Sequence, residues 1–288
     1  MNRLFCFGFG YSASAIAARM QARGWEIFGT SRSDAGMSRM QSAGVTGFRF
    51  DGKRHAPDLV AALRSSTHVL ISVAPDPEGD PVLRHHRDDI ANCIDGAWLG
   101  YLSTVGVYGD HCGAWVDELT PPRPTSERSV RRMAAEKAWS EFCGSACFSL
   151  QVFRLAGIYG PGRSAIDKLK AGSARRLVKE GQVFNRIHVD DIAGVVEAGA
   201  RQPGKVGIYN VSDDLPAPPQ DVVAYAAERL GVPAPPEVPF AAADLSPMAR
   251  SFYSENKRVS NSRIKKTLAV SLTYPTYREG ISAIVAQS

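Results

Sequence analysis

The chain has 288 residues, a length that suits one large α/β domain or a core with an appendage. Hydrophobic residues make up 44% of it, as expected of a globular protein with a buried core. The net charge of +5 comes from 34 basic and 29 acidic residues, and no stretch matches a DNA- or RNA-binding module. We therefore expect a solvated basic surface or an anionic small-molecule ligand, and no nucleic-acid partner.

No membrane segment is predicted, because no apolar run approaches the roughly 18 residues that a membrane span needs. The first strand-like run begins at Arg3, which leaves no room for a signal peptide, so we expect a cytoplasmic protein. The five cysteines are an odd number, which argues against a disulfide framework. Cys143 and Cys147 lie four residues apart without a second pair to complete a zinc set, and no metal site is predicted.

The first half of the chain alternates short apolar runs with amphipathic stretches, a pattern typical of a parallel sheet covered by helices. Strands are predicted over 3–10, 25–33, 44–52, 67–75, 96–110 and 148–160. Helices are predicted over 12–24, 56–66, 82–94 and 126–139. In the third of these helices, His85 and His86 fall on a polar face and are expected to be exposed.

After Gly160 the alternation loosens. The pattern predicts a basic helix and turn over 164–182, a strand and a helix over 183–200, a strand over 205–213 and a helix within 216–240. Asp190 or Asp191 is the predicted cap of the helix that ends near residue 200. We infer a nucleotide-binding core over 1–160 with returning segments at about 183–215, and a smaller lobe over 161–182 and 216–288.

A glycine motif follows the first predicted strand and begins the first predicted helix. Gly8, Gly10 and Ala13 form a G-x-G-x-x-A pattern, with Tyr11 and Ser12 as further candidates for cofactor contacts. Gly8 permits a tight turn, Gly10 leaves room for a pyrophosphate, and Ala13 allows close packing of helix on strand. The alternative is a glycine turn without a ligand. The motif and the alternation predict a Rossmann-type doubly wound α/β fold with a smaller C-terminal substrate lobe, and a dinucleotide cofactor.

The end of the second predicted strand favours NADP(H) over NAD(H). It reads Ser31-Arg32-Ser33, where an NAD-binding protein would usually carry a carboxylate. Arg32 offers a planar fork to a 2′-phosphate and the two serines offer hydroxyl groups, although Arg32 could also be a plain surface residue. Asp51, which closes the third strand, meets the adenine ring or caps a turn. Ala74, near the end of the fourth strand, completes the predicted cofactor contacts.

Several sequence blocks in order carry a resemblance to a known family. "GFGYSA", "YLSTVGVYGD", "FRLAGIYGPGR" and "NRIHVDDIA" recur across nearly all of the 288 residues. With them the chain resembles the extended short-chain dehydrogenase/reductase superfamily, of the NAD-dependent epimerase/dehydratase type. The closing "YNVSDD" and "NKRVSNSRI" look more like a bacterial atypical branch of it.

The resemblance implies where the chemistry would lie. The family uses a Ser or Thr at the end of the fifth strand and a Tyr-x-x-x-Lys motif on the following helix, in which the lysine helps to lower the pKa of the tyrosine. Thr104 matches the hydroxyl that polarises the substrate oxygen, with Ser103 beside it. The alternative for Thr104 is an ordinary β-branched strand residue.

The helix over 126–139 departs from the family at the proton-transfer residues. Glu136 matches the family's glutamate four residues after its lysine and eight after its tyrosine, which places Arg132 and Arg128 at those two positions. No tyrosine lies between Tyr108 and Tyr159, so a shifted register does not restore the motif. Arginine is a poor general acid. Arg132 could still bind a ribose or pyrophosphate and Arg128 an acidic group of a substrate, or both could be solvated.

Other polar residues are assigned by the same resemblance. His188, Asp190 and Asp191 mostly fix a helix and the returning chain in the family, which favours a structural role. Arg163, Lys257 and Arg258 stand where relatives bind the phosphate part of a nucleotide sugar, so the resemblance implies an anionic substrate.

Two functions follow from these observations. The first is an NADP(H)-dependent oxidoreductase or epimerase-type enzyme, acting on an anionic or sugar-nucleotide-like small molecule with an atypical acid/base set. The second is a non-catalytic NADP(H)-binding sensor or regulatory scaffold. The substrate lobe favours the enzyme, and the missing tyrosine and lysine favour the sensor. For the oligomeric state, the sequence is compatible with a monomer and with a homodimer.

Overall fold

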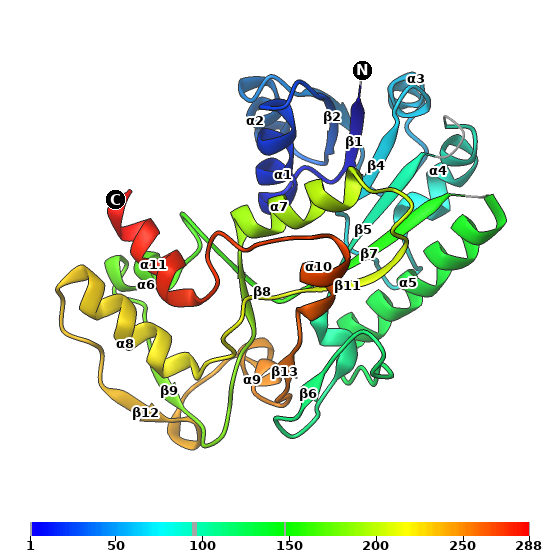
Figure 1. Ribbon diagram of the computed structural model, residues 1–288. Coiled ribbons are helices and arrows are strands. Elements are labelled where there is room, and N and C mark those ends of the chain that lie inside the picture. Colours follow the sequence, from blue (N-terminus) through cyan, green and yellow to red (C-terminus); the bar gives the residue numbers. More distant parts are fainter. Residues whose placement is uncertain (1, 94–96, 147, 288) are drawn as a thin grey trace.

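A single parallel sheet forms the centre of the protein (Figure 1). The structure is a computed structural model that describes residues 2–93, 97–146 and 148–287; Cys147 lies outside them. The sheet has the order β11-β7-β5-β4-β1-β2-β3, and every neighbouring pair is parallel. Its strands are β1 (Arg3–Phe7), β2 (Glu26–Ser31), β3 (Thr46–Arg49), β4 (His68–Ile71), β5 (Trp98–Thr104), β7 (Ser149–Leu155) and β11 (Gly207–Val211). The predicted Rossmann-type fold is confirmed.

Helices cover both faces of this sheet. They are α1 (Tyr11–Gln21), α2 (Asp34–Ser42) and α7 (Val189–Ala200) on one face, and α3 (Val60–Arg64), α4 (Pro81–Ala91) and α5 (Glu127–Ala146) on the other. Because successive side chains of a strand point to opposite faces, β1 contributes to two separate cores. Leu4 and Cys6 pack on the α1 side, whereas Phe5 and Phe7 pack on the α5 side.

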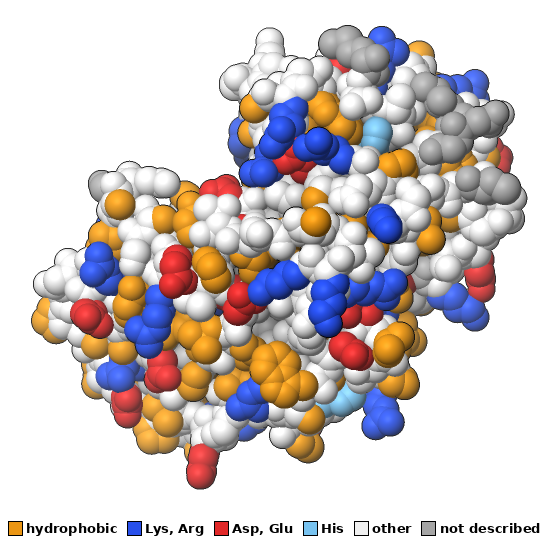
Figure 2. All heavy atoms as spheres, viewed as in Figure 1, with side chains coloured by type: hydrophobic (Ala, Val, Ile, Leu, Met, Phe, Trp, Pro, Cys, Tyr) orange, Lys and Arg blue, Asp and Glu red, His pale blue; other side chains and the backbone are white. Residues whose placement is uncertain are grey.

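A smaller part of the molecule lies beyond the carboxyl ends of the strands. It contains α6 (Ala165–Lys170), α8 (Pro219–Leu230), α9 (Pro247–Phe252), α11 (Tyr277–Ala286), β9 (Arg176–Val178), β12 (Glu237–Pro239) and the short helix η3 (Phe240–Ala242). Ile166, Val222 and Ile281 belong to its own hydrophobic cluster. Figure 2 shows basic side chains gathered on one face over the junction between this part and the sheet.

Short pairings join segments that are far apart in the sequence. β6 (Trp115–Val116) pairs with β13 (Arg258–Val259), and β8 (Gly157–Tyr159) pairs with β10 (Arg186–His188). The remaining elements are the short helices η1 (Pro57–Leu59) and η2 (Val105–Tyr108), and α10 (Ser262–Thr267). Among the described residues, no helix is both long and apolar enough to cross a membrane.

The structure differs from the sequence-based expectations at several elements. The strand predicted over 148–160 is two strands, β7 and β8, and helix α2 was not predicted. The side chain of His188, rather than Asp190 or Asp191, caps α7 by accepting a hydrogen bond from the backbone N–H of Asp190. His86 is buried, not exposed, because α4 turns its ring toward the sheet, where it packs on Phe7.

Candidate functional site

The glycine loop joins β1 to α1 and is anchored on β2. The backbone N–H of Gly8 donates to the Thr30 hydroxyl at 2.8 Å, and that of Phe9 donates to the Thr30 carbonyl at 2.8 Å. Gly8 has a φ of +85°, and a Cβ there would lie 2.9 Å from a Val73 methyl group. This position requires glycine for its conformation and its close packing.

Gly10 is not subject to these two constraints. Its φ of −96° suits any residue, and a Cβ there would meet no atom within 4 Å. It is the N-cap of α1, and no side chain caps the helix. The backbone N–H groups of Tyr11, Ser12 and Ala13 make no hydrogen bond within the described part of the chain. Free amides at a helix N-terminus beside open space fit a pyrophosphate.

The end of β2 presents the residues predicted to select the cofactor. Arg32 is exposed and forms no ion pair or hydrogen bond with any other described residue. The Ser31 hydroxyl donates to the Ser33 carbonyl, and the Ser33 hydroxyl caps α2 by accepting from Gly36. A carboxylate two residues after Arg32, that of Asp34, forms an ion pair with Arg49 at the end of β3. A carboxylate bound to an arginine does not repel a 2′-phosphate as a free one would.

Two further predicted cofactor contacts lie at the same edge of the sheet. Asp51 follows β3, is exposed, and accepts a hydrogen bond from the backbone N–H of Lys53 at 2.9 Å. Asp51 therefore caps a turn, which leaves its second oxygen for a ligand. Ala74 follows β4 and is exposed.

The two hydroxyl residues at the end of β5 point to opposite sides. Thr104 is half-buried, and its Oγ1 accepts a hydrogen bond from the backbone N–H of Gly106 at 3.1 Å. Its own proton has no acceptor among the described residues. Ser103 is buried and donates to the Glu136 carboxylate, which also binds Arg154 at 2.7 Å. Ser103 therefore helps to anchor α5, and Thr104 is the hydroxyl available to a ligand.

Arg132 extends from α5 to the carboxyl ends of two central strands. Its Nη1 donates to the carbonyls of Val73 at 3.3 Å and Leu102 at 3.0 Å, and to the Tyr101 hydroxyl at 3.1 Å. Its Nε and Nη2 make no hydrogen bond within the described residues, and the side chain is half-buried. The guanidinium is thus fixed by one nitrogen and has donors left for a ligand at this edge.

The tyrosines beside β5 do not replace the family's acid. Tyr101 is buried against Trp139, and this burial raises the pKa of its hydroxyl. Tyr108 donates to the Asn210 side chain at 2.8 Å, and burial raises its pKa as well. A tyrosine that moves protons near neutrality needs the opposite shift.

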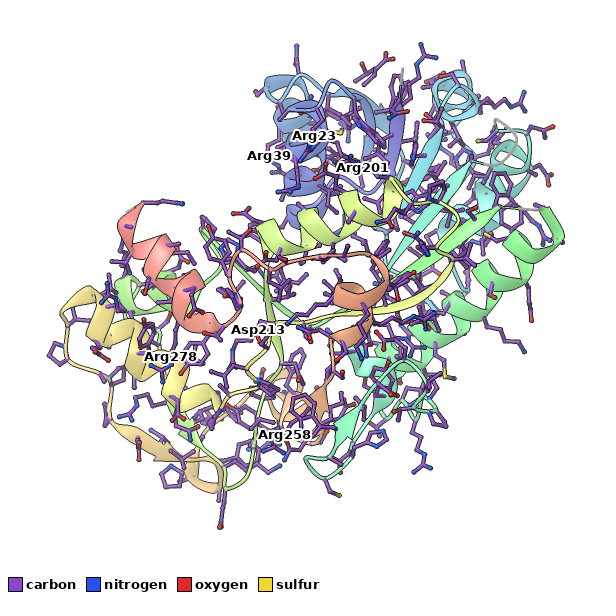
Figure 3. All side chains as sticks on the ribbon, in the orientation of Figure 1. Arg23, Arg39, Arg201, Asp213, Arg258 and Arg278 are labelled. Carbon is purple, nitrogen blue, oxygen red and sulfur yellow. The ribbon has the colours of Figure 1, made fainter. Side chains whose placement is uncertain are left out.

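The predicted substrate-binding cations fall into two groups. Arg128 on α5 is exposed and lies over the Phe252 ring at 5.1 Å, and Arg163 lies over the Tyr11 ring at 5.7 Å. Lys257 is instead buried: its ammonium donates to the Gly109 carbonyl at 2.7 Å and to Glu255 at 2.6 Å. Arg258 (Figure 3) donates to the Gly113 carbonyl. Lys257 and Arg258 therefore bind the loop after η2 to the start of β13.

Comparison with known proteins identifies the fold. No model of a protein family matches the chain. A solved structure of a functionally unknown conserved protein from Silicibacter pomeroyi is 49% identical, with a TM-score of 0.88, over 100% of this chain and 99% of that one. Human epimerase family protein SDR39U1 with NADPH is 18% identical, with a TM-score of 0.75, over 99% of this chain and 100% of that one. The chain belongs to the family of the Silicibacter pomeroyi protein. It has the fold of the human epimerase family protein, that of the extended short-chain dehydrogenases/reductases.

Curated relatives are more distant. Protein YeeZ from Escherichia coli K12 is 26% identical over 82% of this chain and 86% of its own. A 3-diazoavenalumate denitrifying reductase from a Streptomyces species is 27% identical over 81% of this chain and 69% of its own. In this fold Arg128 and Arg132 both lie on α5.

The "NRIHVDDIA" block contributes a residue that the sequence analysis did not single out. Arg186 on β10 is half-buried, and its Nη1 donates to the carbonyls of Phe184 at 2.9 Å and Ala217 at 3.0 Å. Its Nε and Nη2 make no hydrogen bond within the described part of the chain. Burial lowers the pKa of the Arg186 guanidinium. The charge of the buried Asp213 carboxylate (Figure 3) acts in the opposite direction and raises it. An arginine at the start of a short strand, inside the block that carries the resemblance, was the available signal.

The rest of that block has the structural role that the resemblance implied. His188 caps α7, and the Asp191 carboxylate accepts hydrogen bonds from the backbone N–H groups of Thr273 at 2.6 Å and Tyr274 at 3.0 Å. Asp191 thereby holds the returning chain against the start of α7.

Proposed function

We propose that the protein is an NADP(H)-dependent enzyme of oxidoreductase or epimerase type, acting on an anionic, sugar-nucleotide-like small molecule with an atypical acid/base set. The observation that carries this proposal is the convergence at one sheet edge of the uncapped α1 N-terminus, the Thr104 hydroxyl and the Arg132 guanidinium. A bound nicotinamide would supply or accept a hydride there. Residues of this chain would orient the reactants and polarise the substrate.

The proposed cofactor contacts follow from the free groups. The amides at the start of α1 would bind the pyrophosphate, with Gly10 leaving the space that it fills. Arg32 would bind the 2′-phosphate, since its guanidinium has no partner among the described residues and the Asp34 charge is paired with Arg49. The NADPH named with the human structure is consistent with this preference.

At the reacting end, Thr104 would donate a hydrogen bond to the substrate oxygen. Arg132 would orient the nicotinamide ribose through Nε and Nη2, while Nη1 remains on the protein carbonyls. Arginine stays protonated, so Arg132 and Arg128 do not move the proton. We propose that a substrate group or water does so.

Arginines also support an anionic substrate. Arg128, Arg163 and Arg186 each have a guanidinium that forms no ion pair with a carboxylate among the described residues. A guanidinium fork suits a phosphate or carboxylate. Arg186 is the most restricted of the three, because Nη1 is bound to two carbonyls and the other donors keep a fixed direction.

The test is turnover. Purified protein with NADPH or NADP⁺ is assayed against a panel of nucleotide sugars and carbonyl compounds, by cofactor absorbance and by product analysis. We expect turnover of at least one anionic compound, with kcat reduced about 100- to 1,000-fold in Thr104→Val, as for other lost donors to a developing oxyanion. Ser129→Ala, on the same end of α5, is the control.

The alternative function is a non-catalytic NADP(H) sensor, which the arginines at positions 128 and 132 of α5 favour. Tight NADPH binding without turnover of any compound in the panel would contradict the enzyme proposal and support the sensor. Absence of cofactor binding would contradict both.

A further inference from the structure

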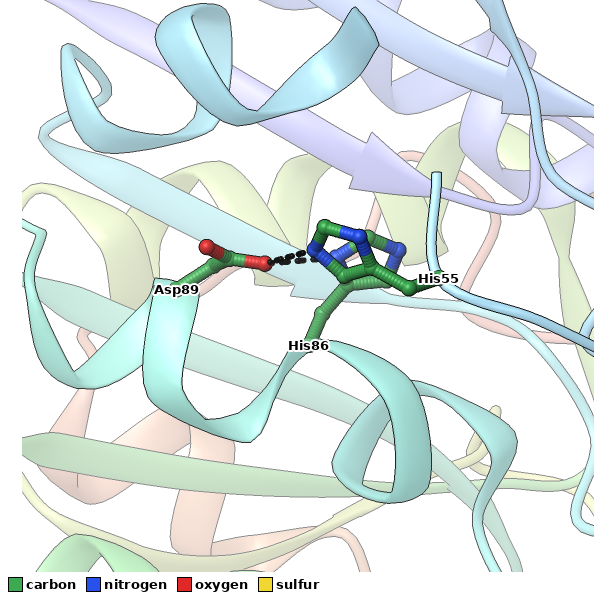
Figure 4. Close-up of side chains that lie close together, drawn as sticks. All are labelled: His55, His86 and Asp89. Carbon is green, nitrogen blue, oxygen red and sulfur yellow. Dashed lines mark hydrogen bonds and ion pairs between the residues drawn. The ribbon is translucent and has the colours of Figure 1, made fainter. Parts of the chain in front are cut away.

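Three side chains of metal-ligating type converge on one point outside the site described above (Figure 4). His55 lies in the segment between β3 and η1, and His86 and Asp89 lie on α4. Asp89 Oδ2 is 2.8 Å from His55 Nε2 and 2.9 Å from His86 Nδ1. All three candidate ligand atoms lie within 4.8 Å of one another.

The fold holds two of these side chains firmly. α4 departs from helical geometry at His86, where φ is −132° and ψ is 17°. This turn places the imidazole against the rings of Phe7 and Phe50, with centroids 5.6 and 5.1 Å away. His86 and Asp89 are both buried, so their ligand atoms keep one relative position. The His55 side chain is 49% exposed and lies outside the helices and strands.

We propose that His55, His86 and Asp89 bind a divalent transition-metal ion, with Zn²⁺ the best match. Two imidazoles and a carboxylate are a usual ligand set for zinc, with a water in the fourth position. Tetrahedral bonds of about 2.0–2.1 Å separate ligand atoms by about 3.3 Å. On metal binding the two separations from Asp89 Oδ2 would therefore open by about 0.5 Å and the imidazoles would draw together, which requires a small movement of His55, the most exposed of the three side chains.

The surrounding contacts are compatible with an ion. In the metal-free protein a proton on each imidazole bridges to the same carboxylate oxygen, and the ion takes the place of both protons. The second carboxylate oxygen is held by Arg64 at 3.2 Å, which orients Asp89 as an outer contact of a metal site commonly does. His86 Nε2 gains a proton and gives up a long contact from the backbone N–H of Ala56, at 3.4 Å.

The bound ion would join the loop after β3 to α4. This loop follows β3 and includes Asp51, but the proposed metal site and the proposed cofactor site share no residue. Metal binding and cofactor binding can therefore be measured separately.

Metal titration tests the proposal. Tag-free protein is treated with a chelator, dialysed and titrated with Co²⁺, and then with Zn²⁺ as a competitor, by calorimetry and visible absorbance. We expect one equivalent of Co²⁺ to bind with the d–d bands of a tetrahedral site and to be displaced by Zn²⁺. Zn²⁺ should also raise the Tm, because it binds the folded protein.

Variants locate the ion. His55→Ala, on the exposed loop, and Asp89→Asn should each weaken Co²⁺ binding at least about 100-fold, the upper end of what loss of an outer contact causes. His85→Ala is the matched control and should bind as the wild type does. Circular dichroism establishes that each variant is folded.

The proposal is overturned if no equivalent of Co²⁺ or Zn²⁺ binds below about 100 μM, or if His55→Ala binds as tightly as the wild type. Gly10→Val, which lacks the proposed pyrophosphate space, should keep full metal binding. The metal proposal and the cofactor proposal can thus be contradicted independently of each other.

Discussion

Gly8 and Gly10 lie two residues apart in one loop, yet each is glycine for its own physical reason. Gly8 is required by a positive φ and by the approach of Val73. Gly10 adopts a conformation open to any residue, and the space beside it is empty of protein atoms. The sequence motif treats both glycines alike, but the structure shows a folding constraint at Gly8 alone; the cofactor is the constraint that we propose for Gly10.

Gly10→Val should therefore abolish cofactor binding while the fold survives. The added side chain would fill the space proposed for the pyrophosphate, and NADPH affinity should fall more than about 100-fold. The free energy of unfolding should change by about 1 kcal/mol or less, since a Cβ at this position would meet no protein atom within 4 Å. Fluorescence titration and urea denaturation measure the two quantities. Gly8→Val is the contrasting variant and should destabilise the protein, because of its φ and Val73.

Arg32→Ala should change cofactor preference. A charge-assisted hydrogen bond is worth about 1.5–3 kcal/mol, so NADPH affinity should fall about 10- to 100-fold while NADH affinity stays within about twofold. The control is Arg39→Ala, an exposed arginine on the neighbouring helix α2 (Figure 3). Equal losses for NADPH and NADH would contradict the 2′-phosphate assignment.

At the scale of elements, α5 is held by a buried charge network. Glu136 accepts hydrogen bonds from Ser103 on β5 and from Arg154 on β7, and all three side chains are buried. The sequence used Glu136 only to set the register of the helix. The structure adds that this glutamate fixes the distance of α5 from β5 and β7, and so positions Arg132.

Glu136→Gln should lower stability markedly. The amide keeps a partner for Ser103 but leaves the Arg154 charge buried and unpaired, which costs about 3–5 kcal/mol. Glu141→Gln is the matched control on the same helix, because its ion pair with Lys137 is exposed and should contribute about 0.5 kcal/mol or less. Urea denaturation of both variants measures the difference. Similar losses in the two variants would contradict the role of the buried network.

Helix α2 shows why an element was missed. Its sequence, DAGMSRMQS, has few apolar residues, and only Met37 and Met40 face the core. Such a polar helix lacks the periodic stripe that sequence analysis detects. The start signal was present, since Ser33 caps the helix by accepting from Gly36.

At the scale of the whole molecule, Asp213 lies at the junction of the sheet and the smaller part (Figure 3). Burial raises the pKa of its carboxyl to about 7, and its Oδ2 has no hydrogen-bond partner among the described residues. The unfolded chain would lose this proton near pH 4. Between about pH 4 and pH 7 the folded protein thus binds a proton that the unfolded chain has released, so Asp213 makes stability fall as the pH rises.

Asp213→Asn should remove this dependence. Relative to the wild type, the variant should gain stability from about pH 4 to pH 7 and keep a constant advantage above that, up to about 4 kcal/mol for a shift of about three pKa units. Urea denaturation at pH 5, 6, 7 and 8 measures the difference between the two proteins. A difference that is independent of pH would contradict the raised pKa of Asp213.

The sequence by itself determined the α/β class, the glycine loop, the arginine at the end of β2 and the absence of a tyrosine from α5. These features follow from local patterns, namely apolar runs, glycines at fixed offsets and the order of a few blocks. Tertiary structure decided which hydroxyl at the end of β5 binds a protein carboxylate and which donates to no described residue, because the side chains of residues 103 and 104 point to opposite sides of the sheet.

Tertiary structure also decided which charged groups are used by the protein itself. Lys257 binds a loop more than a hundred residues earlier in the chain, and His55 meets Asp89 across a sequence separation of 34. Such contacts depend on how strands and helices pack in space, so no spacing motif in the sequence reveals them.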